Sequence, residues 1–187
     1  NDIIKVDGIV LSYQNELQMK VSRIRKSSEG EFDELNYIPA TDKDVNVLFE
    51  HISDFINSVS NTYLSQLLKK IFFENEIINN EFKNHSAAKN MHHGYMGGLI
   101  EHTLSVTQIA DFMSGRYKFV NRDLLIASAL LHDIGKIFEL SNFPENDYTD
   151  DGQLLGHIII GAELITKTAN EIENFPKRLL SLLKHCI

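Results

Sequence analysis

The spacing of hydrophobic residues changes once along the chain, near residue 40. Within residues 2–26, apolar residues alternate with polar or charged neighbours, and this period of two is typical of β-strands. The pattern predicts two strands joined as a hairpin near residues 13–15. A polar stretch over residues 27–40 follows, and we expect a linker there. Because an isolated two-stranded hairpin is only marginally stable, we expect it either to pack on other elements or to belong to a larger β domain.

After residue 40, apolar residues recur at intervals of three and four, which is typical of amphipathic helices. Thr41 with Asp44 resembles a capping box, Asn121 is a good N-cap, and Pro176 suits the first position of a last helix. We expect an exposed loop over 141–151 and only a weak helical pattern up to residue 90. The strongly periodic segments are 45–59, 63–72, 97–113, 121–132, 154–172 and the segment after residue 176. The sequence therefore predicts a mainly α protein with a short β segment at its start.

Composition narrows the class of protein. Hydrophobic residues make up 43% of the 187 residues and charged residues 24%, as in globular proteins. We find no apolar segment long enough to span a membrane, and the single cysteine, Cys186, fits a reducing cytoplasm. The net charge of −8 argues against a nonspecific binder of duplex DNA. It leaves open an enzyme that acts on nucleotides or RNA, because bound metal ions can supply positive charge locally.

His132 and Asp133 follow directly after an apolar run over residues 124–131. The run is typical of a buried helix, and we expect Gly135 to be its stop signal. Burying an imidazole and a carboxylate is costly without compensation. A carboxylate is also unfavourable at a helix C-terminus, which carries partial negative charge. A bound metal cation would compensate both side chains.

Four histidines, each in or beside an apolar helical segment, lie 25 to 30 residues apart: His102, His132, His157 and His185. A helical bundle can direct one side chain from each of several helices into a common site. Nitrogen and carboxylate ligands suit manganese, iron, cobalt, nickel or zinc better than calcium. The alternative is that each histidine is an ordinary hydrogen-bonded core residue, and the spacing alone leaves both interpretations open.

The histidine-containing segments resemble the HD superfamily of metal-dependent phosphohydrolases. They read HHGYMGGLIEHT at 92–103, LLHDIGK at 130–136, DDGQLLGH at 150–157 and LKH at 183–185. With a β segment before the helices, the chain is similar to the YhaM-type 3′-to-5′ exoribonucleases, also described as cmp-binding factors. In that family an OB-type nucleic-acid-binding domain precedes the HD domain. The resemblance thus implies a partial OB-type domain at 1–30, a linker with helices at 31–90, and an HD-type helical bundle at 91–187.

The resemblance also implies a set of metal ligands. By position, His102, His132 and Asp133 match the ligands of a principal metal, and His157 and His185 match those of a second. We expect Mn²⁺, although iron, cobalt, nickel and zinc accept the same ligands. The family pattern further implies a late Asp, a paired-His block soon after residue 185, and OB strands before residue 1. We therefore expect the sequence to be a fragment of a longer enzyme, inactive by itself.

Other residues near the histidines have two interpretations each. Lys136 either contacts a phosphate oxygen or stabilises the end of a helix, while Asp133 could steer a water molecule besides holding metal. His93 and Tyr95 either line a substrate pocket or only cap and pack the next helix. Glu101 either orients a ligand or is an exposed helix residue.

The β segment carries a cluster of basic residues with an aromatic neighbour. Lys20, Arg23 and Arg25, with Tyr13 near the turn, fit a groove for single-stranded nucleic acid. The alternative is an ordinary solvated strand end. Taken with the resemblance, the sequence predicts a cytoplasmic, metal-dependent 3′-to-5′ exoribonuclease that degrades single-stranded RNA, and single-stranded DNA as a second substrate, to nucleoside monophosphates.

Two other functions stay open. The first is a phosphohydrolase of small nucleotides, including a cyclic-nucleotide phosphodiesterase, which has no need of a basic hairpin. The second is a nucleic-acid-binding factor whose metal site is only structural. The apolar stripe over 45–59 belongs either to the core or to a homo-oligomer interface.

Overall fold

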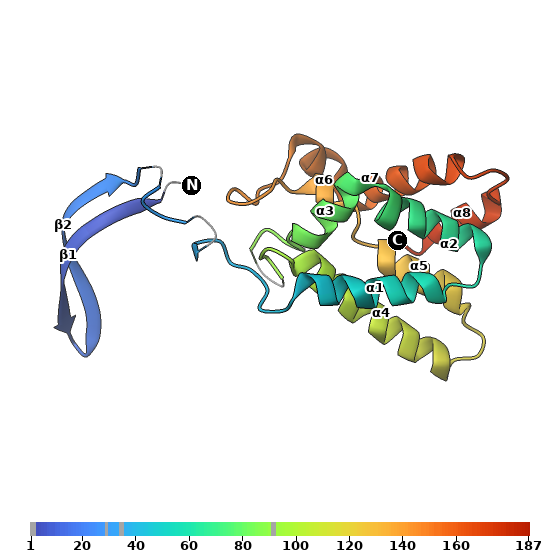
Figure 1. The fold of residues 1–187 in the computed structure, drawn as a ribbon, viewed down its shortest axis with the longest axis horizontal. Helices are drawn as coiled ribbons and strands as arrows, with labels where there is room; N and C mark the ends of the chain where they lie inside the picture. Colours follow the sequence, from blue (N-terminus) through green and yellow to red (C-terminus); the bar gives the residue numbers. More distant parts are fainter. Residues whose placement is uncertain (1–2, 29, 34–35, 91–92) are drawn as a thin grey trace. The chain divides into compact units, whose positions relative to one another are not determined.

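Strands and helices lie in separate units of the chain, Asn1–Ile38 and Pro39–Ile187 (Figure 1). The computed structural model describes residues 3–28, 30–33, 36–90 and 93–187. Residues 31–90, expected as a linker with helices, divide between the two units at residue 38. The helices of that segment therefore belong to the same unit as the rest of the helical bundle.

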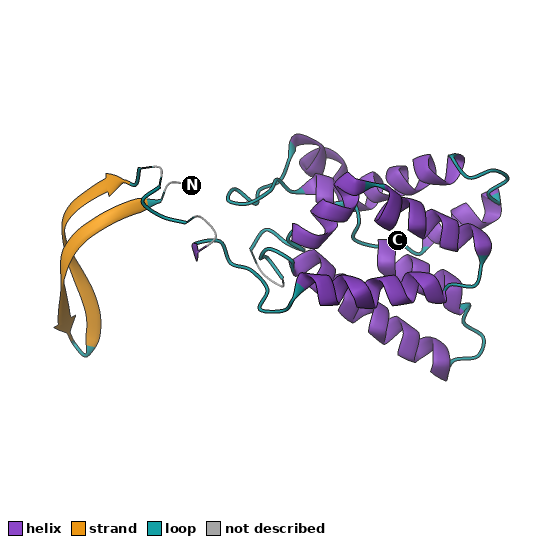
Figure 2. Cartoon of the chain, viewed as in Figure 1, coloured by secondary structure: helices purple, strands orange, loops and turns teal. Residues whose placement is uncertain are grey.

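The first unit contains an antiparallel hairpin of β1 (Ile4–Tyr13) and β2 (Glu16–Lys26), drawn in orange in Figure 2. Gln14 and Asn15 form the turn with φ values of 52° and 65°. Two successive left-handed residues are typical of the type I′ turn, whose twist matches that of paired strands. The predicted hairpin and its turn are confirmed, whereas an OB-type domain around it stays a prediction.

The second unit is helical throughout its regular elements, so the predicted mainly α fold is confirmed. The helical bounds are α1 Val45–Ser58, α2 Thr62–Lys69, the π-helix η2 Lys70–Glu74, α3 Glu76–Asn84, α4 Gly98–Arg116, α5 Arg122–Leu131, α6 Lys136–Glu139, α7 Asp150–Asn170 and α8 Lys177–His185. The weakly patterned segment before residue 90 thus contains a true helix, α3. The sequence pattern missed the short α6. None of the helices in the described ranges has the length and apolar character needed to cross a membrane.

The core lies where α1, α2, α4 and α5 meet, and α4 packs along both α1 and α5 (Figure 1). Ile52 and Ile56 of α1 are fully buried there. The stripe over 45–59 therefore contributes to the core. Every residue of α5 from Ile126 to Leu131 is buried, as its continuous apolar run predicts. This helix carries the His-Asp pair into the interior from its C-terminal end.

The start of α1 differs from the predicted capping box. Asp44 itself is the N-cap, and its carboxylate accepts the backbone N–H of Asn46 at 2.8 Å. The hydroxyl of Thr41 instead donates to Glu101, 60 residues away, at 2.7 Å. Thr41 therefore makes a tertiary hydrogen bond to Glu101 in place of the local capping bond that the sequence pattern predicted. Spacing along the chain cannot reveal such a contact.

Gly135 does not end α5 as expected. The helix stops at Leu131, and Gly135 has an ordinary right-handed φ of −66°. A Cβ atom on Gly135 would overlap the backbone carbonyl oxygen of His157 in α7. The glycine is therefore needed for a close approach between segments, and this approach brings α7 beside the His-Asp pair.

This close approach predicts a large cost for Gly135→Ala. The added Cβ would meet backbone atoms, which cannot rotate away, so we expect a loss of at least about 2 kcal/mol in unfolding free energy. Urea denaturation of the two proteins measures this loss. The matched control is Gly115→Ala, at an exposed helical position with open space around it. The control should be neutral or gain up to about 1 kcal/mol. Equal stabilities for the two variants would contradict the packing explanation.

Candidate metal centre

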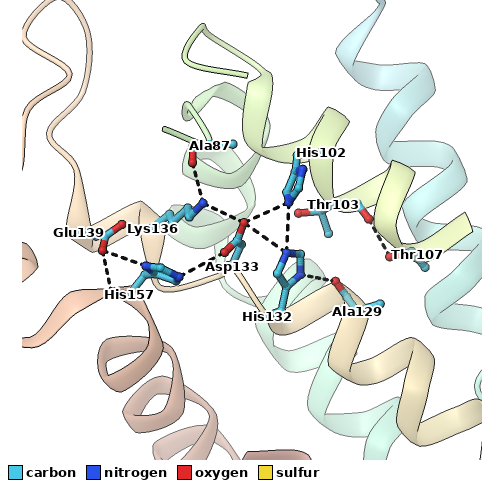
Figure 3. Close-up of polar contacts among 10 residues, drawn as sticks. All are labelled: Ala87, His102, Thr103, Thr107, Ala129, His132, Asp133, Lys136, Glu139 and His157. Atoms are coloured by element: carbon cyan, nitrogen blue, oxygen red, sulfur yellow. Dashed lines mark hydrogen bonds and ion pairs between the residues drawn. The ribbon is translucent and has the colours of Figure 1, made fainter. Parts of the chain in front are cut away.

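Three side chains from two elements converge on one point (Figure 3). His102 lies on α4, and His132 and Asp133 lie in the turn after α5. The Oδ2 atom of Asp133 is 3.3 Å from Nε2 of His102 and 3.2 Å from Nε2 of His132. The two Nε2 atoms are 3.3 Å apart, and one ligand atom from each residue fits within a 4.8 Å cluster. The expected convergence of these three residues is thus observed.

The ring of His132 is oriented by the helix that precedes it. Its Nδ1 atom lies 2.8 Å from the carbonyl oxygen of Ala129. A carbonyl only accepts hydrogen bonds, so Nδ1 carries the proton and donates it. In the neutral ring, the lone pair is then on Nε2, which faces the cluster. This is the orientation that metal-binding histidines adopt in proteins.

The second carboxylate oxygen of Asp133 faces a different histidine. Its Oδ1 atom lies 3.5 Å from Nε2 of His157, which comes from α7 (Figure 3). The carboxylate therefore has two imidazoles on one oxygen and one imidazole on the other. Asp133 would therefore be available as a ligand on both of its carboxylate oxygens.

Glu139 completes the surroundings of His157, and the sequence pattern did not reveal it. The residue lies at the end of α6 and is only 9% exposed. Its Oε1 atom accepts from Nδ1 of His157 at 2.9 Å and from the backbone N–H of His157 at 3.0 Å. The only signal was an acidic residue in an apolar segment shortly after the His-Asp pair. Its partner, 18 residues later, could not be inferred.

Lys136 contacts the site carboxylate rather than the end of α5. Its ammonium lies 3.0 Å from Oδ2 of Asp133 and donates to the carbonyl oxygen of Ala87 at 2.7 Å. The helix-end interpretation of this residue therefore finds no support in its contacts. Contact with a phosphate stays a prediction.

Burial and pairing act in opposite directions on the two titrating groups. Burial alone would raise the pKa of Asp133, but hydrogen bonds from His102 and His132, with the contact from Lys136, hold it well below its usual range. Burial likewise disfavours a charged His132, yet the hydrogen bond and charge of Asp133 outweigh it and raise the pKa of His132. Without metal, the site therefore keeps a carboxylate beside an imidazole that readily takes a proton.

A polar network of Glu101, Tyr95 and His93 lies beside His102. Glu101 is 9% exposed, so its interpretation as an exposed helix residue is wrong. It accepts from the hydroxyl of Tyr95 at 3.0 Å and pairs with Lys43 at 2.6 Å. Burial and this hydrogen bond raise the pKa of Tyr95 to about 12. Since the tyrosine proton points to the glutamate, the 2.7 Å contact between Tyr95 and Nδ1 of His93 has the histidine as donor.

Tyr95 and His93, two of the predicted site residues, thus belong to a network that extends to His102. The ring centroids of His93 and His102 are 5.5 Å apart. Whether they touch substrate stays a prediction. His185, by contrast, is exposed at the end of α8, and no hydrogen bond or ion pair joins it to the cluster. Its role in a second metal site also stays a prediction.

The basic residues of the hairpin share one face. Alternate residues of β1 from 5 to 9 point to one side, and so do their partners on β2. These partners are Arg25, Arg23 and Lys20. Arg25 forms two 2.6 Å contacts with Glu31 and thereby lowers the pKa of this carboxyl to about 2. Lys20 and Arg23 are exposed.

The donor set fits a divalent transition metal. Imidazole nitrogens and a carboxylate suit manganese, iron, cobalt, nickel or zinc. The close approach of two lone-pair-bearing nitrogens to one carboxylate oxygen is favourable only with a proton or a cation between them.

Comparison with known proteins agrees with this geometry. Residues 99–186 match the family model described as HD domain, and this range contains all the clustered histidines together with Asp133 and Glu139. This match supports a relationship between this part of the chain and the HD superfamily of metal-dependent phosphohydrolases. No solved structure matches the chain.

The pKa shifts predict a pH window for the metal-free protein. The raised pKa of His132 gives stability that is fully present below the ordinary histidine value of about 6.5 and is lost as pH rises through the raised pKa. The lowered pKa of Asp133 gives stability that is present above about 3.9 and is lost as pH falls. The stability difference between the native chain and His132→Gln should therefore be largest between these values.

Denaturant unfolding in a chelator, from pH 3 to pH 9, measures this difference. His51→Gln, an exposed histidine on α1, is the matched control and should show a small difference that hardly changes with pH. A constant difference between the native chain and His132→Gln over the whole range would contradict the ion pair.

Proposed function

We propose that this chain is part of a metal-dependent 3′-to-5′ exoribonuclease that degrades single-stranded RNA, with single-stranded DNA as a second substrate. The observation that carries the hydrolase part is the placement of Asp133, with imidazoles on both of its oxygens, inside an HD domain. The resemblance to YhaM-type enzymes and the basic face of the hairpin support an RNA substrate. The single cysteine is compatible with a reducing cytoplasm.

In this proposal His102, His132 and Asp133 hold the first divalent cation, and His157 on the other carboxylate oxygen serves a second. Mn²⁺ is the proposed ion, and iron, cobalt, nickel and zinc are its alternatives. A divalent cation supplies a water of lowered pKa and neutralises charge on a phosphodiester. His185 is a candidate ligand of the second cation by resemblance alone.

The protein's own residues would prepare the site for an anionic substrate. Asp133 remains ionised at neutral pH because its pKa is held low, so it stays available as a negatively charged ligand. Lys136 is held by the carbonyl of Ala87 with its ammonium beside that carboxylate. From there it can donate to a non-bridging phosphate oxygen and stabilise the charge that develops during hydrolysis.

The hairpin would bind the RNA strand before the reaction. Lys20 and Arg23 are exposed on the same face, and Asp7 lies opposite Arg23 in the strand register. Such basic side chains follow the phosphate backbone of single strands without reading the sequence. Arg25, which is already paired with Glu31, contributes less.

Asp133→Asn tests the hydrolase assignment. In the longest version of the protein that degrades RNA, the amide should reduce the rate by at least about 1,000-fold, because it removes the charge that two cations share. Assays use single-stranded RNA labelled at its 5′ end, so that removal of 3′ nucleotides gives a descending ladder and released monophosphates. The matched control is Asp54→Asn, an exposed aspartate on α1 that should keep full activity. Hydrolysis retained by Asp133→Asn would show that the hydrolysis does not come from this site, as expected for a nucleic-acid-binding factor whose metal is structural.

A double variant, Lys20→Ala with Arg23→Ala, tests the RNA substrate. Loss of two phosphate contacts should weaken RNA binding about tenfold or more near physiological salt and flatten its salt dependence. Hydrolysis of the small diester bis(p-nitrophenyl) phosphate should not change. The control pair is Arg116→Ala with Lys118→Ala, two exposed basic residues at the end of α4 and just beyond it. An equal loss on both substrates, or no loss on either, would favour a phosphohydrolase of small or cyclic nucleotides.

A further inference from the structure

Helix α7 is broken immediately before His157. Gly156 has φ 72° and ψ 161°, a conformation outside the helical region although helical residues lie on both sides. Essentially only glycine adopts this backbone geometry, because a Cβ would be strained there. The break makes His157 the start of a second helical segment. Its backbone N–H consequently lies among the unpaired donors at a helix N-terminus.

Glu139 satisfies this donor from a different element. Its Oε1 accepts the backbone N–H of His157 at 3.0 Å. A carboxylate at this position is also favourable because the N-terminus of a helix carries partial positive charge. Glu139 therefore caps the second segment of α7 from outside that helix, and the break at Gly156 gives it access to the donor.

The same oxygen also determines the state of the His157 ring. Nδ1 of His157 lies 2.9 Å from Oε1 of Glu139. An ionised carboxylate only accepts, so Nδ1 carries the proton and the neutral ring has its lone pair on Nε2. That lone pair points toward Oδ1 of Asp133, 3.5 Å away. One glutamate atom thereby fixes both the backbone and the side chain of this histidine.

Glu139 is itself held rigidly. Its backbone carbonyl accepts the N–H of Thr149 at 3.0 Å, and the hydroxyl of Thr149 donates to the carbonyl of Phe138 at 2.8 Å. A Cβ on Gly152 would overlap the carbonyl oxygen of Glu139, so α6 and the first turn of α7 are in direct backbone contact. The backbone of Glu139 is thus held in a tightly packed position from which its side chain reaches His157.

We propose that Glu139 is the positioning residue of the second cation site. It sets the Nδ1–H tautomer of His157, directs Nε2 toward Asp133, and places a negative charge behind the ring that strengthens Nε2 as a ligand. Gly156 serves the same purpose by freeing the backbone N–H that Glu139 binds. This inference rests on the proposed function only for the presence of a second cation.

The first experiment needs no metal. In the chelator-treated chain labelled with ¹⁵N-histidine, at a pH where the ring is neutral, nitrogen chemical shifts report which ring nitrogen carries the proton. We expect Nδ1–H for His157 in the native chain and in Glu139→Gln, whose amide oxygen still accepts. Glu139→Ala and Gly156→Ala should give a mixture of tautomers. Glu163→Gln, on the exposed side of α7, is the matched control and should not change.

The second experiment counts bound Mn²⁺ by the loss of its free-ion electron paramagnetic resonance signal. We expect two ions in the native chain and in Glu163→Gln. Glu139→Gln should bind the first ion normally but the second about 10- to 100-fold more weakly, because the substitution removes the negative charge and keeps the shape of the side chain. Normal binding of the first ion also shows that this variant is folded, so a folding defect in Glu139→Ala would not hide the result.

The outcomes separate the two proposals. An Nε2–H tautomer in the native chain, or a second Mn²⁺ affinity unchanged in Glu139→Gln, overturns the positioning role while leaving the hydrolase proposal intact. A native chain that binds a single Mn²⁺ overturns the second cation site in both proposals, whatever the tautomer. Two ions and an altered second affinity support the positioning role even where the chain does not degrade RNA.

Discussion

The buried carboxylate of Asp133 is the constraint on which the rest of the helical unit depends. A charge in the interior is tolerated only with partners, and here they come from four segments: His102 from α4, His132 from its own turn, Lys136 from α6 and His157 from α7. Each partner makes the buried anion less costly, and the anion in turn favours the approach of the segments that carry these partners. The site and the packing of these helices therefore cannot be separated.

Backbone contact makes this convergence possible. Gly135 lies against the carbonyl of His157, and Gly152 lies against the carbonyl of Glu139, so α6 and α7 approach more closely than side chains would allow. The break at Gly156 then turns the N–H of His157 toward Glu139. Three glycines thus act on one histidine, two by leaving space and one by adopting a backbone conformation that other residues avoid.

Local patterns were reliable where a short segment decides its own structure. The hairpin turn at Gln14 and Asn15, the N-cap Asn121 and the apolar run of α5 all agree with expectation, because turn geometry, capping and helix periodicity act over a few residues. Patterns failed where a distant residue competes for the same group. Thr41 was assigned to a capping box but bonds Glu101, and Glu101 was considered an exposed helix residue but is buried.

By itself the sequence determined the order of the main strands and helices, without the short α6. Its motifs predicted one candidate metal site of His102, His132, Asp133, His157 and His185, and the class of metal that such ligands favour. These follow from periodicity, residue chemistry and motif. Only the tertiary structure decided that Asp133 presents its two oxygens to different histidines, that Lys136 contacts this carboxylate, and that Glu139 supports His157. These contacts form between segments that are distant in sequence. Packing of the helices, rather than spacing along the chain, sets the directions of the side chains that make them.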